Sequence, residues 1–288
     1  MILLAIITQS VIGALDNPPV IDDKKINCEM IEKRKFQPTL RVMSFNMLFD
    51  LYDKQLTPEN RWPERKKRII EYILHAKPDI IGSQELQNNQ RLDLLEALGD
   101  EYILFGNERA ILYRKDRLKL LNHRESGRFM TACFEDCKKR CFTVINTHFS
   151  FSSIECRLAE AKQLASMARS IQGPLIVTGD FNTFPLRPEL PLPFFDGDYI
   201  LSVIESGGLK DSHDITACGR FGPIASTNLC SETMLPFKDT FCPGVILDHI
   251  FVNDCVKVKC TAIDPAKVDG CYLSDHFPVI ADVDFIAN

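Results

Sequence analysis

Residues 174–182 read PLIVTGDFN and decide how the rest of the chain is interpreted. The apolar run PLIVT is typical of a fully buried strand, which we expect to stop at Gly179. A carboxylate, Asp180, and a carboxamide, Asn182, then follow two residues apart. In extended backbone such a pair faces the same side, where it could orient and deprotonate a water molecule. An Asx turn that ends the strand is the alternative.

Polar residues stand at the ends of further predicted strands. They are Asn46 after strand 40–46, Glu85 after strand 79–83, His148 after strand 142–146, Asp248 in strand 245–252, and Asp275 with His276 before strand 278–283. Active sites of α/β proteins gather at strand ends. A single such residue has a simple explanation as a solvated turn, but five strands that end in this way predict a site.

The chemistry of these side chains suits a hard cation and a negatively charged substrate. Glu85 could bind Mg²⁺, which prefers carboxylates, water and substrate oxygens. The carboxylate of Asp275, next to His276, can hold the imidazole or raise its pKa. A protonated His276 can then stabilise a developing negative charge, whereas a surface turn is the alternative for this dipeptide.

The order of predicted elements favours a mixed-sheet α/β sandwich over a purely parallel βαβ fold, because several strands follow one another directly. We see no linker between domains. The predicted helices are 64–76, 89–98, 155–171 and 199–206, and the remaining predicted strands are 102–105, 110–113, 118–121, 129–134 and 256–262.

Composition is that of a soluble globular chain: 288 residues, 45% of them hydrophobic and 25% charged. The net charge of -5 excludes a globally basic surface for gripping nucleic acid, although a local basic cleft remains open. No run reaches the roughly 18 to 20 apolar residues of a membrane-spanning helix.

Residues 1–15, MILLAIITQSVIGAL, are predicted to be a signal peptide, although no Lys or Arg precedes the apolar run. A buried N-terminal strand or helix is the alternative. Residues 16–38 are polar and form a lead-in. The signal peptide would make the protein secreted or lumenal in the secretory pathway, and its absence would make the protein cytoplasmic.

The 11 cysteines all lie beyond residue 15, which suits an oxidising compartment. Their odd number leaves at least one unpaired. Cys133, Cys137 and Cys141 crowd one hairpin-like segment, so we expect a local disulfide there, with buried free thiols as the alternative. Because the spacing is CxxxCxxxC and no CxxC pair exists, a structural zinc site is not expected.

Taken in order, these motifs resemble the endonuclease/exonuclease/phosphatase superfamily, which has the DNase I-like fold. The motifs are SFN at 44–46, QE at 84–85, NTH at 146–148, GDFN at 179–182, LDHIFV at 247–252 and SDHFPV at 274–279. The flanking sequence is most similar to the bacterial-type branch and to the carbon-catabolite-repressor-like deadenylase and nocturnin branches. The resemblance implies a four-layer α/β sandwich of two packed mixed β-sheets flanked by helices, with one catalytic domain at 39–288.

The resemblance also implies roles for residues at a metal-assisted site. Glu85 would bind the catalytic Mg²⁺, or Mn²⁺, with Asn46 beside it. Asp180 would act as general base or orient the attacking water. Asn182 would hold the phosphoryl group. His276 would stabilise the pentacovalent transition state, held by Asp275 or by another acidic partner.

Three further residues have implied supporting roles. Asp248 would support the metal or the histidine, His148 would contact phosphate, and Arg128 would either touch substrate or be a surface arginine.

The chain also departs from the family pattern. Leu48 replaces an acidic residue of the abasic-site endonucleases, Ser150 replaces an Asp that supports the phosphate-contacting histidine, and His249 replaces a more usual Tyr or Arg.

These residues favour a Mg²⁺-dependent phosphoesterase, with nucleic acid as the expected substrate and a 3′–5′ exonuclease on single strands as the leading form. A secreted phosphatase or phosphodiesterase acting on phospholipid headgroups, inositol phosphates or nucleotides is the alternative. A non-catalytic binding protein on the same fold is disfavoured because every core position is filled by a competent residue. We expect a monomer.

Overall fold

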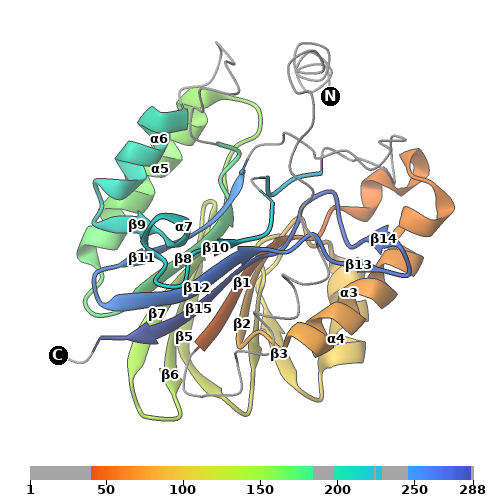
Figure 1. Ribbon diagram of the computed structural model, residues 1–288, viewed down its shortest axis with the longest axis horizontal. Coiled ribbons are helices and arrows are strands. Elements are labelled where there is room, and N and C mark those ends of the chain that lie inside the picture. The colour runs from red at the N-terminus through yellow and green to blue at the C-terminus, as the bar shows by residue number, and fades with distance from the viewer. Residues whose placement is uncertain (1–39, 184–196, 224, 229–245, 287–288) are drawn as a thin grey trace.

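Two β-sheets lie face to face in the computed structural model of the chain, which describes residues 40–183, 197–223, 225–228 and 246–286 (Figure 1). The predicted signal peptide and lead-in lie outside these residues. One sheet has seven strands and the other six. The pairs β1–β2, β7–β8 and β10–β12 are parallel and the other ladders are antiparallel, so both sheets are mixed.

The bounds of the strands follow the spatial order of each sheet. The seven-stranded sheet consists of β10 (Arg220–Phe221), β12 (Val256–Ile263), β15 (Val279–Phe285), β1 (Leu40–Asn46), β2 (Ile80–Gln84), β4 (Ile111–Arg114) and β3 (Tyr102–Phe105). The six-stranded sheet consists of β5 (Leu118–Ser126), β6 (Phe129–Asp136), β7 (Cys141–His148), β8 (Leu175–Asp180), β11 (Asp248–Asn253) and β9 (Leu209–Asp211). A separate ribbon pairs β13 (Lys267–Val268) with β14 (Cys271–Tyr272).

Helices cover the outer face of each sheet. Figure 1 shows α3 (Trp62–Ala76) and α4 (Asn88–Leu98) on one side and α5 (Ile154–Ser170) and α6 (Gly197–Glu205) on the other. The short helices are η2 (Asp50–Gln55), η3 (Pro58–Asn60) and α7 (Ser212–Ile215). The α3 helix ends where Lys77 turns left-handed, before Pro78, which cannot continue a helix. The four-layer α/β sandwich is confirmed.

Three apolar clusters fill the spaces between the layers. The central cluster joins both sheets through residues such as Val42, Ile80 and Ile250. A second lies under α3 and α4, and a third under α5 and α6. Strands β1 and β8 are buried at every position, as expected for β8 from the apolar run PLIVT.

Gly82 of β2 lies close against the facing sheet. A Cβ on Gly82 would lie 1.9 Å from the Thr178 hydroxyl and 2.6 Å from Asn146 Oδ1. That carboxamide is fully engaged, since it donates to Ser83 O and Ala110 O and accepts from the Thr178 hydroxyl and from Gln84. The NTH asparagine is therefore a buried tie between sheets beneath the site.

Gly82→Ala should lower the free energy of unfolding by about 3 kcal/mol, because the added methyl overpacks a site that cannot yield. Urea denaturation measures the change. The control is Gly127→Ala, whose Cβ meets nothing within 4 Å and whose left-handed φ of 58° should cost only about 1 kcal/mol. Equal losses in the two variants would show that the close approach is not what constrains Gly82.

Some boundaries differ from those predicted. Strand β8 continues through Asp180 instead of stopping at Gly179, because Asp180 pairs in register with His148 and Asp248. The short elements β9, α7 and β10 and the β13–β14 ribbon were not predicted, since two to four residues carry too little periodicity. Among the described residues, no helix is long and apolar enough to cross a membrane.

The predicted local disulfide is absent: Cys133, Cys137 and Cys141 are all free thiols. Cys133 pairs across β6–β7 with Thr143, while Cys141 pairs with Glu135. The two cysteines are therefore diagonal neighbours, about 7–8 Å apart in such a ladder, which is beyond the usual reach of a disulfide. Register, which the spacing alone does not reveal, separates them.

Candidate active site

The predicted site residues meet at one edge of the two sheets. Parallel strands place their carboxyl ends together, so β1 with β2, and β7 with β8, deliver their last residues to this edge. The antiparallel neighbours β11 and β15 begin there, and β15 runs from it toward the end marked C in Figure 1. Asp180 is thus flanked in register by His148 on one side and Asp248 on the other.

Asn46 links two carboxylates across the sheets. Its Nδ2 donates to Glu85 Oε1 at 3.1 Å and to Asp180 Oδ2 at 3.0 Å. Its Oδ1 accepts from the Leu48 amide at 3.0 Å, and Glu85 Oε2 accepts from the Phe49 amide at 3.3 Å. Glu85 and Leu48 both have a left-handed backbone, with φ of 59° and 56°. Such backbone is strained in residues other than glycine, so the surrounding contacts must hold it.

Arg65 supplies one of those contacts. The side chain is buried on α3, and its Nη1 donates to Met47 O at 2.5 Å while its Nη2 donates to Leu48 O at 3.1 Å. Two charge-assisted bonds to consecutive carbonyls fix the turn after Asn46. The sequence interpretation missed Arg65. Its place four residues before Ile69, on the buried face of the helix, is the signal that could have found it.

His276 is held by Asp248. Its Nδ1 lies 2.7 Å from Asp248 Oδ2, and its Nε2 lies 3.9 Å from Asp180 Oδ2. The Ser226 hydroxyl donates to the same Asp248 oxygen at 2.7 Å. Asp275 Oδ1 instead accepts from the Ser274 hydroxyl at 3.0 Å. The carboxylate that bonds the His276 ring is therefore Asp248, and not the adjacent Asp275.

The two carboxylates keep the His276 ring charged. Burial alone would lower its pKa, but Asp248 and Asp180 outweigh it and raise that pKa well above 6.5. A buried imidazolium therefore faces the carboxylate of Asp180. A fixed cation at this place is suited to a substrate whose negative charge grows during reaction.

His148 finds its support in an unexpected residue. Its Nδ1 lies 3.1 Å from Glu108 Oε1, and its Nε2 lies 3.7 Å from Asp180 Oδ2. Burial lowers the pKa of His148, but Glu108 and Asp180 outweigh it and the net pKa is raised. Glu108 therefore supplies the carboxylate that supports the His148 ring, a role that Ser150 cannot fill. It stands 40 residues before His148 in the chain, so no local motif marks it.

Asn182 and Arg128 lie around this cluster. Asn182 has a left-handed φ of 48°, and its amide donates to Asp180 Oδ1 at 2.9 Å. The extended pairing expected for Asp180 and Asn182 was wrong, and the Asx-turn alternative describes the contact. Asn182 Nδ2 donates to Phe149 O at 3.0 Å. Arg128 is 41% exposed, forms an ion pair with Glu160 at 2.8 Å and donates to the His148 carbonyl at 3.2 Å.

The donor set fits a hard divalent cation. Burial and the neighbouring Asp275 carboxylate raise the pKa of Glu85, so negative charge is crowded there. Asp248 Oδ1 is buried and has no hydrogen-bond partner. Single ligand atoms of Asp180, Asp248 and His276 lie within 4.8 Å of one another. Because the His276 Nδ1 already bonds Asp248, the carboxylate oxygens are the better ligands, and oxygen ligands are those that Mg²⁺ prefers.

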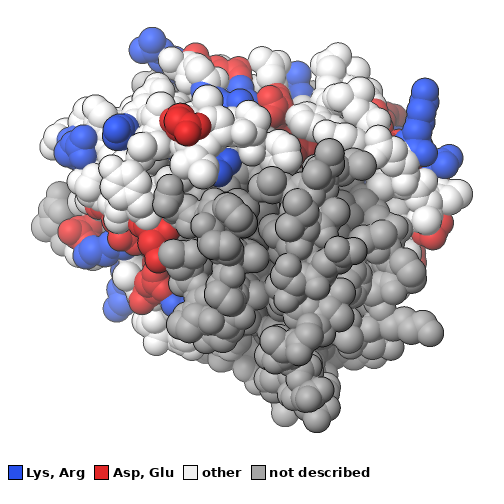
Figure 2. Space-filling view, turned by 90° about the horizontal axis from the view of Figure 1, so that it is seen from above, with Lys and Arg blue, Asp and Glu red and all other residues white. Residues whose placement is uncertain are grey.

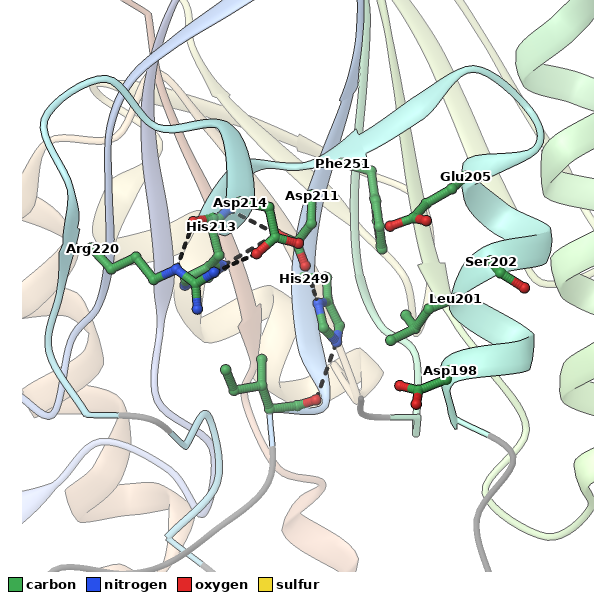
Figure 3. Close-up of a pocket in the computed structure, with 11 residues that line it drawn as sticks. Asp198, Leu201, Ser202, Glu205, Asp211, His213, Asp214, Arg220, His249 and Phe251 are labelled. Atoms are coloured by element: carbon green, nitrogen blue, oxygen red, sulfur yellow. Dashed lines mark hydrogen bonds and ion pairs between the residues drawn. The ribbon is translucent and has the colours of Figure 1, made fainter. Parts of the chain in front are cut away.

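A cavity of about 290 Å³ lies on the other face of β11. It is lined by residues of α6, β9, α7 and β11, including His249 and Phe251 (Figure 3). Asp248 alternates with these two residues along the strand and therefore points to the catalytic cluster instead. The cavity is thus separate from the cluster.

The model of the endonuclease/exonuclease/phosphatase family matches residues 43–276. The chain belongs to this family. The matched range holds every residue of the cluster, from Asn46 to His276. Members of the family are phosphoric ester hydrolases. The family enzymes use divalent metal ions, in keeping with the buried acidic and histidine group at this edge.

Individual relatives agree with this assignment. Over 270 residues the chain is 23% identical to carbon catabolite repressor protein 4 homolog 3 of Arabidopsis thaliana, covering 81% of this chain and 58% of that protein. It is 28% identical to nocturnin of Xenopus laevis over 196 residues, covering 54% and 50%. The chain thus spans about half the length of these curated relatives. A solved endonuclease/exonuclease/phosphatase from Bacteroides vulgatus is 26% identical, with a TM-score of 0.70, covering 87% of this chain and all of that one.

Proposed function

We propose that the protein hydrolyses phosphodiester bonds by metal-assisted in-line attack of water, with Mg²⁺ as the usual ion and Mn²⁺ as a substitute. We further propose single-stranded nucleic acid as the substrate. The observation that carries the chemistry is the hydrogen-bonded cluster in which Asn46 joins Glu85 to Asp180 while the charged His276 faces Asp180.

Glu85 would hold the metal ion, with Asn46 keeping its carboxylate in place. The crowded charge of Glu85 and Asp275, and the unpartnered Asp248 oxygen, support a cation at this edge. When bound, such an ion neutralises phosphoryl charge and lowers the pKa of bound water.

The protein's own groups would do the rest. Asp180 accepts from Asn46 and from the Asn182 amide, so its carboxylate is fixed in one orientation and could hold a water or take its proton. His276 would donate to the phosphoryl oxygens as their charge grows, and Asp248 would keep its ring oriented. His148 and Asn182 would contact the phosphate, because both lie beside Asp180.

Two observations support a nucleic-acid substrate. The relatives belong to the deadenylase and nocturnin branches that the motifs resemble. In addition, Phe151 is 65% exposed and lies in the turn after His148. Arg157 donates to its carbonyl, and Asn182 donates to Phe149 in the same turn. An exposed ring on a turn whose main chain is held in this way suits stacking with a nucleobase. Figure 2 shows basic and acidic side chains interspersed among the described residues of that face.

Phe151→Ala should raise KM for a single-stranded RNA oligonucleotide about tenfold, because stacking of a base contributes roughly 1–3 kcal/mol. The kcat for a small ester, bis(p-nitrophenyl) phosphate, should not change. Steady-state kinetics on both substrates measure the effect. Leu121→Ala, which removes a 44% exposed side chain from the edge strand β5, is the control. An unchanged KM for RNA would remove the stacking role.

The substrate proposal is tested with labelled single-stranded RNA and Mg²⁺, using EDTA and Asp180→Asn as controls. A product ladder that requires both the metal and Asp180 is expected, and its polarity distinguishes 3′–5′ exonuclease from endonuclease action. Intact RNA alongside rapid hydrolysis of a phospholipid headgroup, inositol phosphate or nucleotide would reject the nuclease and favour the small-ester alternative.

A further inference from the structure

His249 is a buried residue that the catalytic cluster does not use. It follows Asp248 on β11 and points to the opposite face of the strand, where it is 2% exposed. Its Nδ1 lies 2.6 Å from Asp211 Oδ2. Figure 3 draws this contact as a dashed line. Its Nε2 lies 3.1 Å from Ile246 O and 3.3 Å from Thr183 O. All three partners are acceptors, so both ring nitrogens carry a proton and donate.

The carbonyls that His249 binds belong to the two segments that carry active-site groups. Thr183 directly follows Asn182 in the turn after Asp180. Ile246 lies two residues before Asp248. The two segments are also joined by the β8–β11 ladder, which pairs Asp180 with Asp248, and by the Phe181 amide, which donates to Leu247 O at 2.8 Å. His249 therefore adds a side-chain link between them, from behind the face that carries the cluster.

Asp211 and two aromatic rings fix the orientation of this imidazole. Asp211, on β9, also accepts from the His213 amide at 2.9 Å, so the carboxylate is itself held. Burial alone would raise the pKa of Asp211, but His249 and His213 outweigh it and the net pKa is lowered. Phe251 stacks on His249 with centroids 5.5 Å apart, and Phe181 contacts its edge at 5.7 Å. The two aromatic contacts fix the plane of the His249 ring, and its two hydrogen-bonded nitrogens fix its rotation in that plane.

We infer that His249, braced by Asp211, is a positioning residue that holds the 180–183 turn against the start of β11. In this way it limits the movement of Asp180 and Asp248 on the other side of the strand, where the β8–β11 ladder ends. The inference rests on the hydrolase activity of the cluster. It gives a reason for a histidine at a position where the family more often has Tyr or Arg.

His249→Gln tests the inference, because glutamine is polar but cannot donate to Asp211 and to the two carbonyls at once. With bis(p-nitrophenyl) phosphate and Mg²⁺, we expect kcat to fall about 10- to 100-fold, as for other groups that orient a site from behind, while KM stays within about twofold. Amide hydrogen exchange should speed up at Phe181 and Asp248 and not in the distant strand β3.

His213→Gln is the matched control. His213 bonds the same Asp211 carboxylate through its Nδ1, at 3.3 Å, but its ring forms no hydrogen bond with residues 180–183 or 246–248 in the described part of the chain. It should leave kcat and the exchange of both segments unchanged. If His249→Gln does not fold, Asp211→Asn, which keeps the shape of the partner, should give the same pattern with a smaller loss of kcat.

The inference is overturned if His249→Gln retains kcat, if the loss is in KM alone, or if His213→Gln loses as much. The exchange measurement needs no substrate. If the wild-type protein hydrolysed no ester, the hydrolase function would fail, whereas faster exchange at the two segments in His249→Gln alone would still support the positioning role and unchanged exchange would reject it.

Discussion

Asp180→Asn should lower kcat about a thousandfold, or more, while the protein stays folded. Asp180 is the residue on which the cluster converges: Asn46 and the Asn182 amide donate to it, and His148 and His276 face it. Among these five described residues, Asp180 is the carboxylate and therefore the group that could take a proton from water. General-base assistance of this kind contributes about 10²- to 10⁴-fold.

The fold should tolerate this change. An asparagine can still accept from the Asn182 amide and loses about one hydrogen bond, which costs roughly 1–2 kcal/mol. Thermal denaturation should therefore show a small shift. Asp254→Asn removes the same charge from a side chain that is 79% exposed, and it should be silent in both measurements. A kcat within about tenfold of wild type for Asp180→Asn would mean that another group activates the water.

His276→Gln should lower kcat about 10²- to 10³-fold with little change in KM, because the lost cation acts on charge that develops in the transition state. Glutamine can still donate to Asp248, so that this buried carboxylate keeps a second donor besides the Ser226 hydroxyl, whereas an alanine variant would remove that second donor. Since the pKa of His276 lies well above 6.5, wild-type activity that needs this proton should be lost only on the alkaline side of that value.

The control for His276→Gln is His75→Gln on the exposed face of α3. Steady-state kinetics and the pH profile of both variants give the comparison. Retention of the alkaline limb in His276→Gln with an unchanged kcat would assign the stabilising charge to another residue, such as His148.

The site residues at strand ends could be predicted because each one follows or precedes an apolar run that is visible in the local sequence. Asn46, Glu85, Asp180 and His276 each stand beside an apolar strand, and parallel pairing brings such ends together. The conformation of the backbone between them was less accessible. The left-handed turn at Asn182 changed the direction of that side chain, and alternation along a strand could not predict it.

The supporting residues were missed because they come from distant parts of the chain. Glu108 reaches His148 from another strand connection, and Ser226 reaches Asp248 across 22 residues. Asp211 reaches His249 across 38 residues. The tertiary fold brings these pairs together, and Asp211 and His249 meet through the pairing of the adjacent strands β9 and β11. The disulfide expectation failed for a similar reason, because the ladder register sets Cys133 opposite Thr143.

The central claim is that this edge hydrolyses phosphoric esters with a divalent cation held by Glu85. The most direct test titrates Mg²⁺ into wild type and Glu85→Gln, following heat of binding and bis(p-nitrophenyl) phosphate hydrolysis in parallel. We predict one wild-type binding constant that matches the concentration for half-maximal activation, and binding weakened about tenfold or more, with activity lost, in Glu85→Gln. Hydrolysis that persists in EDTA, or Mg²⁺ binding that is unchanged in Glu85→Gln, would contradict the account.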